Sequence, residues 1–115
     1  MIAVIFEVEP AEGRSGDYFD RAADLRPLLE TMDGFISVER FRSLANENRY
    51  LSLSFWRDEA SVAAWRQTEE HRVAQRDGRG GIFADYRLRI ASVVRDYGLR
   101  ARDEAPSDAR AYHHA

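Results

Sequence analysis

FISVERFRSLANENRYLSLSFWRD, residues 35–58, contains two runs of alternating side chains joined by a polar turn. Alternation between two faces predicts a β-strand over residues 35–43 and another over 49–57. The five-residue connection, 44–48, predicts that the two strands form an antiparallel hairpin. Phe35 and Phe41 are expected on one face of the first strand, with Ile36 and Val38 on the other. The second strand sets Leu51, Leu53 and Phe55 opposite Tyr50, Ser52, Ser54 and Trp56.

The segments before this hairpin predict a strand and a helix. Residues 1–9 place only apolar side chains on one face, namely Ile2, Val4, Phe6 and Val8. Residues 17–32 repeat apolar side chains every three or four positions, as an amphipathic helix does. Asp17 is the expected N-cap, and Pro27 is expected to kink or split the helix near Arg26.

The segments after the hairpin repeat this order. Asp58 is the expected N-cap of a second helix that runs to about Asp77, where glycines follow. A last strand is expected over roughly 85–96. The order β-α-β-β-α-β predicts an α+β, ferredoxin-like domain with a four-stranded antiparallel sheet and both helices on one face. This domain spans residues 1–98, and 99–115 are expected to form a mobile C-terminal tail.

Composition excludes several kinds of chemistry. The chain of 115 residues has no cysteine and no lysine, so thiolate metal sites, cysteine nucleophiles and Schiff bases are excluded. Its net charge of −3, without a basic stripe, is untypical of a nucleic-acid-binding protein. No apolar run is long enough to span a membrane, and the apolar N-terminus lacks the basic start of a signal peptide. We therefore expect a cytoplasmic protein without membrane or nucleic-acid partners.

The strands also indicate an oligomer. Several carry apolar or aromatic side chains on both faces, although the helices can cover only one face of the sheet. An uncovered apolar sheet face is unfavourable in water, and a second copy packed against it around a twofold axis would bury it. We therefore expect a homodimer.

The second helix carries the candidate site. Trp65 is the only large side chain at its middle, and the polar residues Thr68, His71 and Gln75 follow at helical spacing. An apolar wall with a few polar groups is typical of a ligand pocket, so one is expected between this helix and the sheet. His71, the only histidine before the tail, could act there as a base. Alternatively it is a surface residue near the helix C-terminus.

The remaining site residues have defined expectations. Trp65 is the second candidate catalytic residue, as a wall of the pocket, while Thr68 and Gln75 are candidate substrate contacts. Trp56 is a third candidate substrate contact, with core packing or a dimer contact as its alternative. No metal ligands cluster in the sequence. His113 and His114 lie in the tail, where a solvated end is the expected explanation.

The run LSLSFWRDEASV, residues 51–62, followed by Ala64-Trp65 and Glu70-His71-Arg72, resembles the antibiotic biosynthesis monooxygenase domain family. The Asp33-Gly34-Phe35 step and the Asp85-Tyr86 strand are similar to that family too, so the resemblance covers residues 1–98. It implies a dimeric α+β barrel. It also implies a monooxygenase that oxidises a small phenol or quinol with O2 and needs no cofactor.

Two alternatives stay open. The first is a haem-binding or haem-degrading protein, whose branch of the family carries an Asn near the end of the first strand, a Trp on the second helix and a haem-ligating His further along it. Trp65 matches, but the Asn position falls near Phe6 or Glu7 and the His position near Gln75. The second alternative is a non-enzymatic dimer that binds a small ligand.

Overall fold

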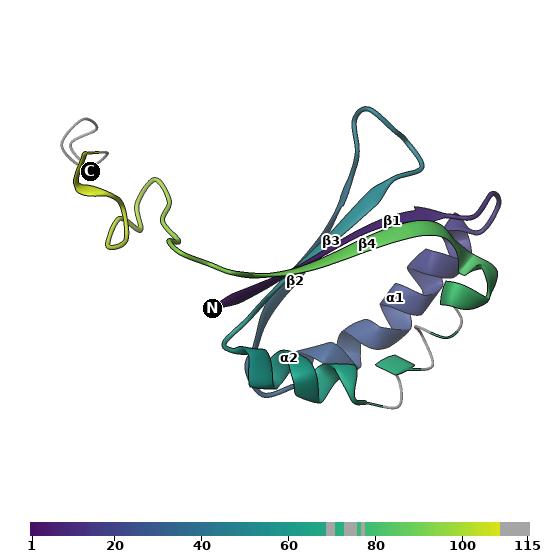
Figure 1. Ribbon diagram of the computed structural model, residues 1–115, viewed down its shortest axis with the longest axis horizontal. Coiled ribbons are helices and arrows are strands. Elements are labelled where there is room, and N and C mark those ends of the chain that lie inside the picture. The colour runs from purple at the N-terminus through teal and green to yellow at the C-terminus, as the bar shows by residue number, and fades with distance from the viewer. Residues whose placement is uncertain (69–70, 73–75, 77, 109–115) are drawn as a thin grey trace.

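Four antiparallel strands form one sheet in the order β2-β3-β1-β4, and both long helices lie on one face of it (Figure 1). The computed structural model describes residues 1–68, 71–72, 76 and 78–108. The predicted ferredoxin-like α+β fold is confirmed. The elements are β1 (Ile2–Pro10), α1 (Ser15–Glu30), β2 (Phe35–Arg42), β3 (Tyr50–Trp56), α2 (Glu59–Arg66), the π-helical turn η1 (Gly78–Ile82) and β4 (Phe83–Ser92).

Helix α1 differs from its prediction at its start and at Pro27. Arg14 is the N-cap, and Asp17 lies in the first turn. Its carboxylate pairs with the Arg14 side chain and interacts favourably with the positive end of the helix dipole. The helix continues through Pro27 to Glu30. Pro27 is exposed and close to the helix end, so the backbone carbonyl that it leaves unpaired can bond to water.

Strand β2 contains an irregularity that the alternating pattern does not reveal. Its register with β3 shifts between Phe35 and Ser37, so that Phe35 pairs with Trp56 and Val38 pairs with Ser54. Phe35 and Val38 consequently pack against the same core cluster. The prediction that they lie on opposite faces is wrong, because an inserted residue in one strand reverses the faces of all that follow.

Helix α2 is shorter than predicted. It ends at Arg66, with Gln67 as C-cap, rather than continuing to Asp77. Its N-cap is Asp58, as predicted; the carboxylate accepts from the Ser61 backbone N–H at 2.8 Å. The Ser61 hydroxyl, which also donates to this carboxylate, then the Ser61 backbone N–H and the Arg57 side chain lower the pKa of Asp58 to about 2. Helical conformation returns at residues 71–72 and 76.

The last strand runs over Phe83–Ser92 and not over 85–96, because the pairing with β1 begins at Phe83 and ends at Ser92. The following residues, to 108, leave the sheet on an extended path (Figure 1). There the Arg102 side chain donates to the Gly98 carbonyl at 3.1 Å and lies over the Tyr97 ring. His113 and His114 fall outside the described residues. No helix within the described ranges could cross a membrane, since none is both long and apolar enough.

The apolar core between sheet and helices is divided into two clusters. One is formed around Ile2, Leu29, Trp56 and Val62, and the other around Val8, Tyr18 and Ile82. The two clusters lie at opposite ends of the strands, since Ile2 and Val8 are the two ends of one face of β1. The space between them is therefore where a cavity can form.

Candidate functional site

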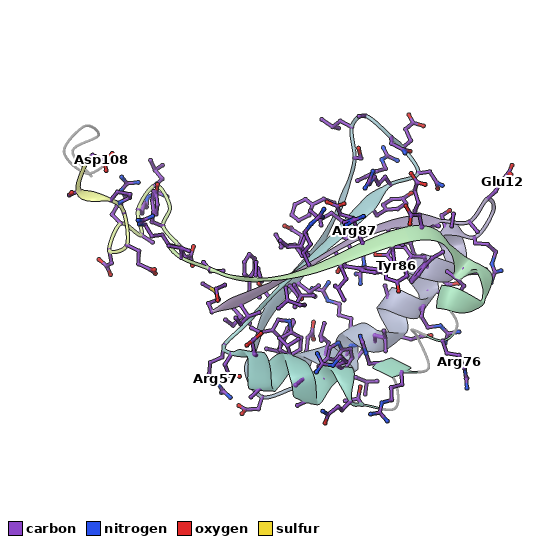
Figure 2. The ribbon with its side chains drawn as sticks, viewed as in Figure 1. Glu12, Arg57, Arg76, Tyr86, Arg87 and Asp108 are labelled. Atoms are coloured by element: carbon purple, nitrogen blue, oxygen red, sulfur yellow. The ribbon has the colours of Figure 1, made fainter. Side chains whose placement is uncertain are left out.

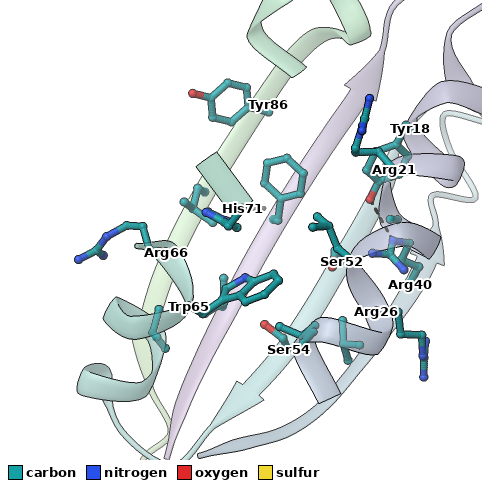
Figure 3. A pocket seen from close by; sticks show the side chains of 18 of the residues that line it. Tyr18, Arg21, Arg26, Arg40, Ser52, Ser54, Trp65, Arg66, His71 and Tyr86 are labelled. Atoms are coloured by element: carbon teal, nitrogen blue, oxygen red, sulfur yellow. Dashed lines mark hydrogen bonds between the residues drawn. The ribbon is translucent and has the colours of Figure 1, made fainter. Parts of the chain in front are cut away.

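A cavity of about 290 Å³ lies between the helices and the helix-facing side of the sheet (Figure 3). Its volume is near the lower end of the range for small-molecule sites, roughly 300–1,000 Å³. The described residues that line it are mostly apolar or aromatic: Val4, Phe6, Tyr18, Ala22, Leu25, Leu29, Val38, Trp56, Val62, Trp65, Ile82, Phe83, Tyr86, Leu88 and Ile90, with Arg21, Arg26, Arg40, Ser52, Ser54, Arg66 and His71 as the polar members.

Two serines of β3 make room for the cavity. The strand registers place Val38, Ser54, Val4 and Ile90 in one row across the sheet, and Arg40, Ser52, Phe6 and Leu88 in the next. Large side chains, Trp56 and Tyr50, flank the serines along β3. A strand that is bulky at its ends and small at its centre leaves a hollow under the helices.

Trp56 closes one end of this hollow. It is almost fully buried, with 1% of its surface exposed, and its indole N–H donates to the Ser54 hydroxyl at 3.0 Å. It also packs edge-on against Phe35, with ring centroids 5.3 Å apart. Since its only donor is used within the protein, Trp56 can offer a ligand an apolar surface but no hydrogen bond.

Trp65 and His71 border the cavity together. Their ring centroids are 5.4 Å apart, with the planes tilted by 59°. Figure 3 shows both side chains on the α2 side, facing the sheet. His71 is therefore not the surface residue of the alternative interpretation. Its role in chemistry stays a prediction.

The environment of His71 favours the neutral imidazole. Burial lowers the pKa of His71, because an apolar surrounding disfavours the charged ring. Its buried Nδ1 atom has no hydrogen-bond partner among the described residues. A neutral ring with a nitrogen not engaged by the protein has the properties of a general base.

Thr68 holds the backbone of this segment rather than lining the cavity. Its hydroxyl donates to the Trp65 carbonyl at 2.8 Å and accepts from the His71 backbone N–H at 3.2 Å. Thr68 is thus an N-cap for the turn that contains His71. Gln75, the remaining predicted substrate contact, lies outside the described residues.

Sequence reasoning missed Arg40 and Tyr18 as site residues. Tyr18 falls within the apolar repeat that predicts a helix over residues 17–32, yet its ring lines the cavity and its hydroxyl accepts from Arg40 Nε at 3.3 Å. Arg40 shares a strand face with Val38 and lies nearer the middle of the strand than Arg42, the other charged residue on that face, so its position was the available signal. Ser52 and Ser54 of β3 are likewise polar residues on the helix-facing side of the sheet.

The fold and the site define a class: a ferredoxin-like α+β domain that encloses a small, largely apolar ligand cavity within one subunit. The model of the family described as antibiotic biosynthesis monooxygenase matches residues 1–77. The chain therefore belongs to the antibiotic biosynthesis monooxygenase family.

Known proteins agree with this membership. The chain is 47% identical over 94 residues to a protein of Pyricularia oryzae named jasmonate monooxygenase ABM, covering 82% of this chain and 44% of that protein. It thus spans less than half of that relative. It is 31% identical over 93 residues to YqjZ of Bacillus subtilis, covering 81% of this chain and 79% of that protein.

Solved structures support the fold. Rv0793 of Mycobacterium tuberculosis matches with a TM-score of 0.76 at 10% identity, covering 84% of this chain and 98% of that one. PA3566 of Pseudomonas aeruginosa matches with a TM-score of 0.71 at 13% identity, covering 81% of this chain and 93% of that one.

Proposed function

We propose that this chain is a monooxygenase that oxidises a small, electron-rich aromatic compound, a phenol or quinol, with O2. The observation that carries the proposal is the position of the half-buried His71 beside Trp65 at the wall of an apolar cavity. Family membership and the name of the Pyricularia relative support monooxygenase as the class of activity. No cofactor is required in this proposal, because the substrate supplies every electron.

The reaction balances without an external reductant. His71 accepts the phenolic proton, and the phenolate then transfers one electron to O2. The resulting pair of radicals combines at a ring carbon to form a peroxide, which His71 protonates. Loss of water from this hydroperoxide, with loss of the ring C–H proton, leaves a C=O group. A phenol and O2 thus become a quinone and water, with four electrons supplied by the ring.

The site would assist each step of this reaction. An apolar cavity reduces the contact of reactive intermediates with water, and Trp65 offers an aromatic surface against which the ring can pack. His71 needs a nitrogen within hydrogen-bond distance of the phenolic oxygen. Its Nδ1 has no partner among the described residues but is buried from solvent, so the ring would have to rotate to bring a nitrogen to the phenolic oxygen.

Oxygen uptake with a panel of phenols and quinols tests the proposal, with the uncatalysed rate subtracted and ¹⁸O₂ used to follow the label into the product. One labelled oxygen atom should enter each product molecule. His71→Ala should lower turnover by about 10²–10⁴, the usual range for loss of a general base. Gln67→Ala, an exposed residue on the same segment, is the matched control and should leave turnover unchanged. Full activity in His71→Ala would contradict the assignment of the base.

The pH dependence has a defined sign. The base must be unprotonated, so kcat/KM should fall as the pH drops through the pKa of His71. Because burial lowers that pKa, the fall should occur below the ordinary range of histidine, roughly 6.5. At neutral pH the rate should be on a plateau. His71→Ala should lack this acid limb, and an acid limb at or above the ordinary histidine range would argue against His71.

Titration of the purified protein with haemin distinguishes the haem alternative from the cofactor-independent monooxygenase. We expect no Soret shift. A shift that is lost in His71→Ala would instead support haem ligation by this residue. Absence of oxygen uptake with every compound, together with retained binding of a small aromatic ligand, would support the non-enzymatic alternative.

We propose further that the chain is a homodimer formed through the uncovered face of the sheet. Both helices lie on the other face (Figure 1). The uncovered face presents apolar side chains from three strands, and Ile36 and Phe41 are 53% and 44% exposed there. Burial of such a face against a second copy would form an interface of obligate size, roughly 2,000 Å² or more.

A further inference from the structure

A positively charged side chain lies at the edge of the cavity that is farthest from β4. Arg40 belongs to β2, the outermost strand, and its row across the sheet continues through Ser52 and Phe6 to Leu88. Arg40 is half-buried. None of the described residues that line the cavity carries a carboxylate. Arg40 thus adds a positive charge on the β2 side of a cavity that Arg21, Arg26 and Arg66 also line.

Arg40 has no ion pair among the described residues. Within the described part of the chain it contacts Tyr18 in two ways: Nε donates to the hydroxyl at 3.3 Å, and the guanidinium carbon lies 5.8 Å from the ring centroid. Arg26, another arginine at the cavity, is by contrast paired with Glu30 at 3.0 Å. A partly buried cation without a carboxylate is unfavourable by itself, and an anionic ligand would compensate for it.

Tyr18 supplies a second donor at the same place. Its hydroxyl accepts from Arg40, so its own proton is not used in that bond. Burial raises the pKa of Tyr18, which keeps the hydroxyl protonated. Figure 3 shows the two side chains meeting on the α1 side of the cavity. The terminal nitrogens of Arg40 and the hydroxyl of Tyr18 can thus donate to one planar anion.

We infer that the Arg40–Tyr18 pair binds a carboxylate on an otherwise apolar compound, so that the substrate of this cavity is a phenol or quinol that also carries a carboxylate. The inference rests on the proposed function in one respect, namely that this cavity holds the substrate. Neighbouring strands are about 4.8 Å apart, so the row from β2 to β4 spans roughly 14 Å. An acid anchored at Arg40 would extend its apolar part across Ser52 and Phe6 toward Trp65 and His71.

The chemistry favours a carboxylate over a phosphate. A guanidinium binds a carboxylate through two parallel hydrogen bonds, and the single charges then balance. A phosphate monoester carries nearly two negative charges at neutral pH, and burial of the second charge among apolar side chains is unfavourable.

The test compares ligands of one shape and different charge. 2-Naphthylacetic acid, its primary amide and 2-naphthyl phosphate are titrated into the full chain, and binding is followed by calorimetry and by tryptophan fluorescence. The acid should bind at least about tenfold more tightly than the amide, as expected for charge-assisted hydrogen bonds. Arg40→Met should weaken binding of the acid by about 10–100-fold and that of the amide by less than threefold.

Three further variants make the result specific. Arg42→Met removes an exposed arginine of the same strand that is not among the residues lining the cavity, and it should change the affinity for the acid by less than threefold. Arg40→Lys keeps the charge but loses the planar fork, so it should bind with intermediate affinity. Tyr18→Phe removes one donor and gives a second measurement if Arg40→Met does not fold.

Several outcomes would overturn the inference. Equal affinities for acid and amide, no binding of either at millimolar concentration, or an unchanged affinity for the acid in both Arg40→Met and Tyr18→Phe would each do so. Tighter binding of 2-naphthyl phosphate than of the acid would overturn the choice of carboxylate. His71→Ala should still prefer the acid, so a failure of the oxygenase proposal and a failure of this one are distinguishable.

Discussion

Gly34 and Gly13 adopt similar backbone conformations in different surroundings. Both have positive φ, 85° and 74°. A Cβ at Gly34 would overlap the Ser61 hydroxyl and lie 2.6 Å from the Ser61 Cβ, whereas a Cβ at Gly13 would meet nothing within 4 Å. Ser61 also donates to the Asp58 carboxylate at 2.7 Å, so its displacement would disturb the N-cap of α2. Gly34 is therefore required both by conformation and by space.

This difference predicts unequal costs of alanine substitution. Gly13→Ala should lower the free energy of unfolding by about 1–2 kcal/mol, the cost of a left-handed conformation for an L residue. Gly34→Ala should lower it by about 1–3 kcal/mol more, the usual cost of overpacking. Urea denaturation followed by circular dichroism measures both. Similar losses in the two variants would show that Ser61 moves aside easily.

At the same scale, the residues of the cavity were only partly predictable. Trp65 and His71 stand out because a tryptophan and a lone histidine are rare residue types, each with evident chemistry. Arg40 does not stand out, since arginine is common in this chain and most of its arginines are exposed. Its importance depends on what it contacts, and the Tyr18 hydroxyl is 22 positions away in sequence. Such long-range contacts cannot be inferred from local spacing.

At the scale of elements, the end of α2 determines the geometry of the site. Trp65 and His71 are six positions apart, and in an uninterrupted helix their side chains would point about 120° apart around the axis. The break at Gln67 and Thr68 brings the two rings to 5.4 Å. The predicted line of Thr68, His71 and Gln75 on one long helix was thus the wrong reason for placing His71 at a cavity.

The interruption gives Thr68 a role that substitution can test. Thr68→Val keeps the shape but removes the hydroxyl that joins Trp65 to His71, so turnover should fall by about 3–10-fold, in proportion to roughly 1 kcal/mol for a lost cap. Thr68→Ser should restore it. NMR of His71 provides an independent measurement: its pKa should return toward the ordinary value in Thr68→Val as the ring loses burial. Unchanged turnover and pKa in Thr68→Val would contradict this role.

The strand pairing shows the same limit of sequence patterns. Alternation identified all four strands, because the pattern of side chains along one strand is local. The shift between Phe35 and Ser37 depends on pairing with β3, as does the row that joins Arg40 to Ser52. Helix α1 illustrates a different limit, since the continuation through Pro27 depends on its exposure near a helix end.

At the scale of the whole molecule, the uncovered sheet face predicts the mass in solution. Light scattering at micromolar concentration should give twice the 13.2 kDa of the chain. Phe41→Glu, on the uncovered face, should shift the mass toward the monomer. Leu28→Glu is the control, because Leu28 is similarly exposed, at 39% against 44%, but lies on α1. A monomeric wild type, or equal effects of the two variants, would exclude this interface.

The small side chains at the centre of β3 favour ligand binding at the expense of the stability of the folded state. Ser52 lies where a larger apolar residue would connect the two core clusters. Ser52→Val should therefore raise the melting temperature, as burial of additional apolar area does, while weakening the binding of 2-naphthylacetic acid. Ser54→Val is the contrasting variant, because it would leave the Trp56 N–H without its partner.

Selection for a higher melting temperature alone would then weaken the binding of the ligand to this protein. Variants recovered from a thermostability screen should accumulate bulky residues at Ser52, and each gain in melting temperature should be accompanied by a loss of affinity. The melting temperature of the wild-type protein would approach that of such variants only with its ligand bound. A ligand that binds the folded state alone stabilises that state by mass action. Its melting temperature would then serve as a direct readout in the search for the natural substrate.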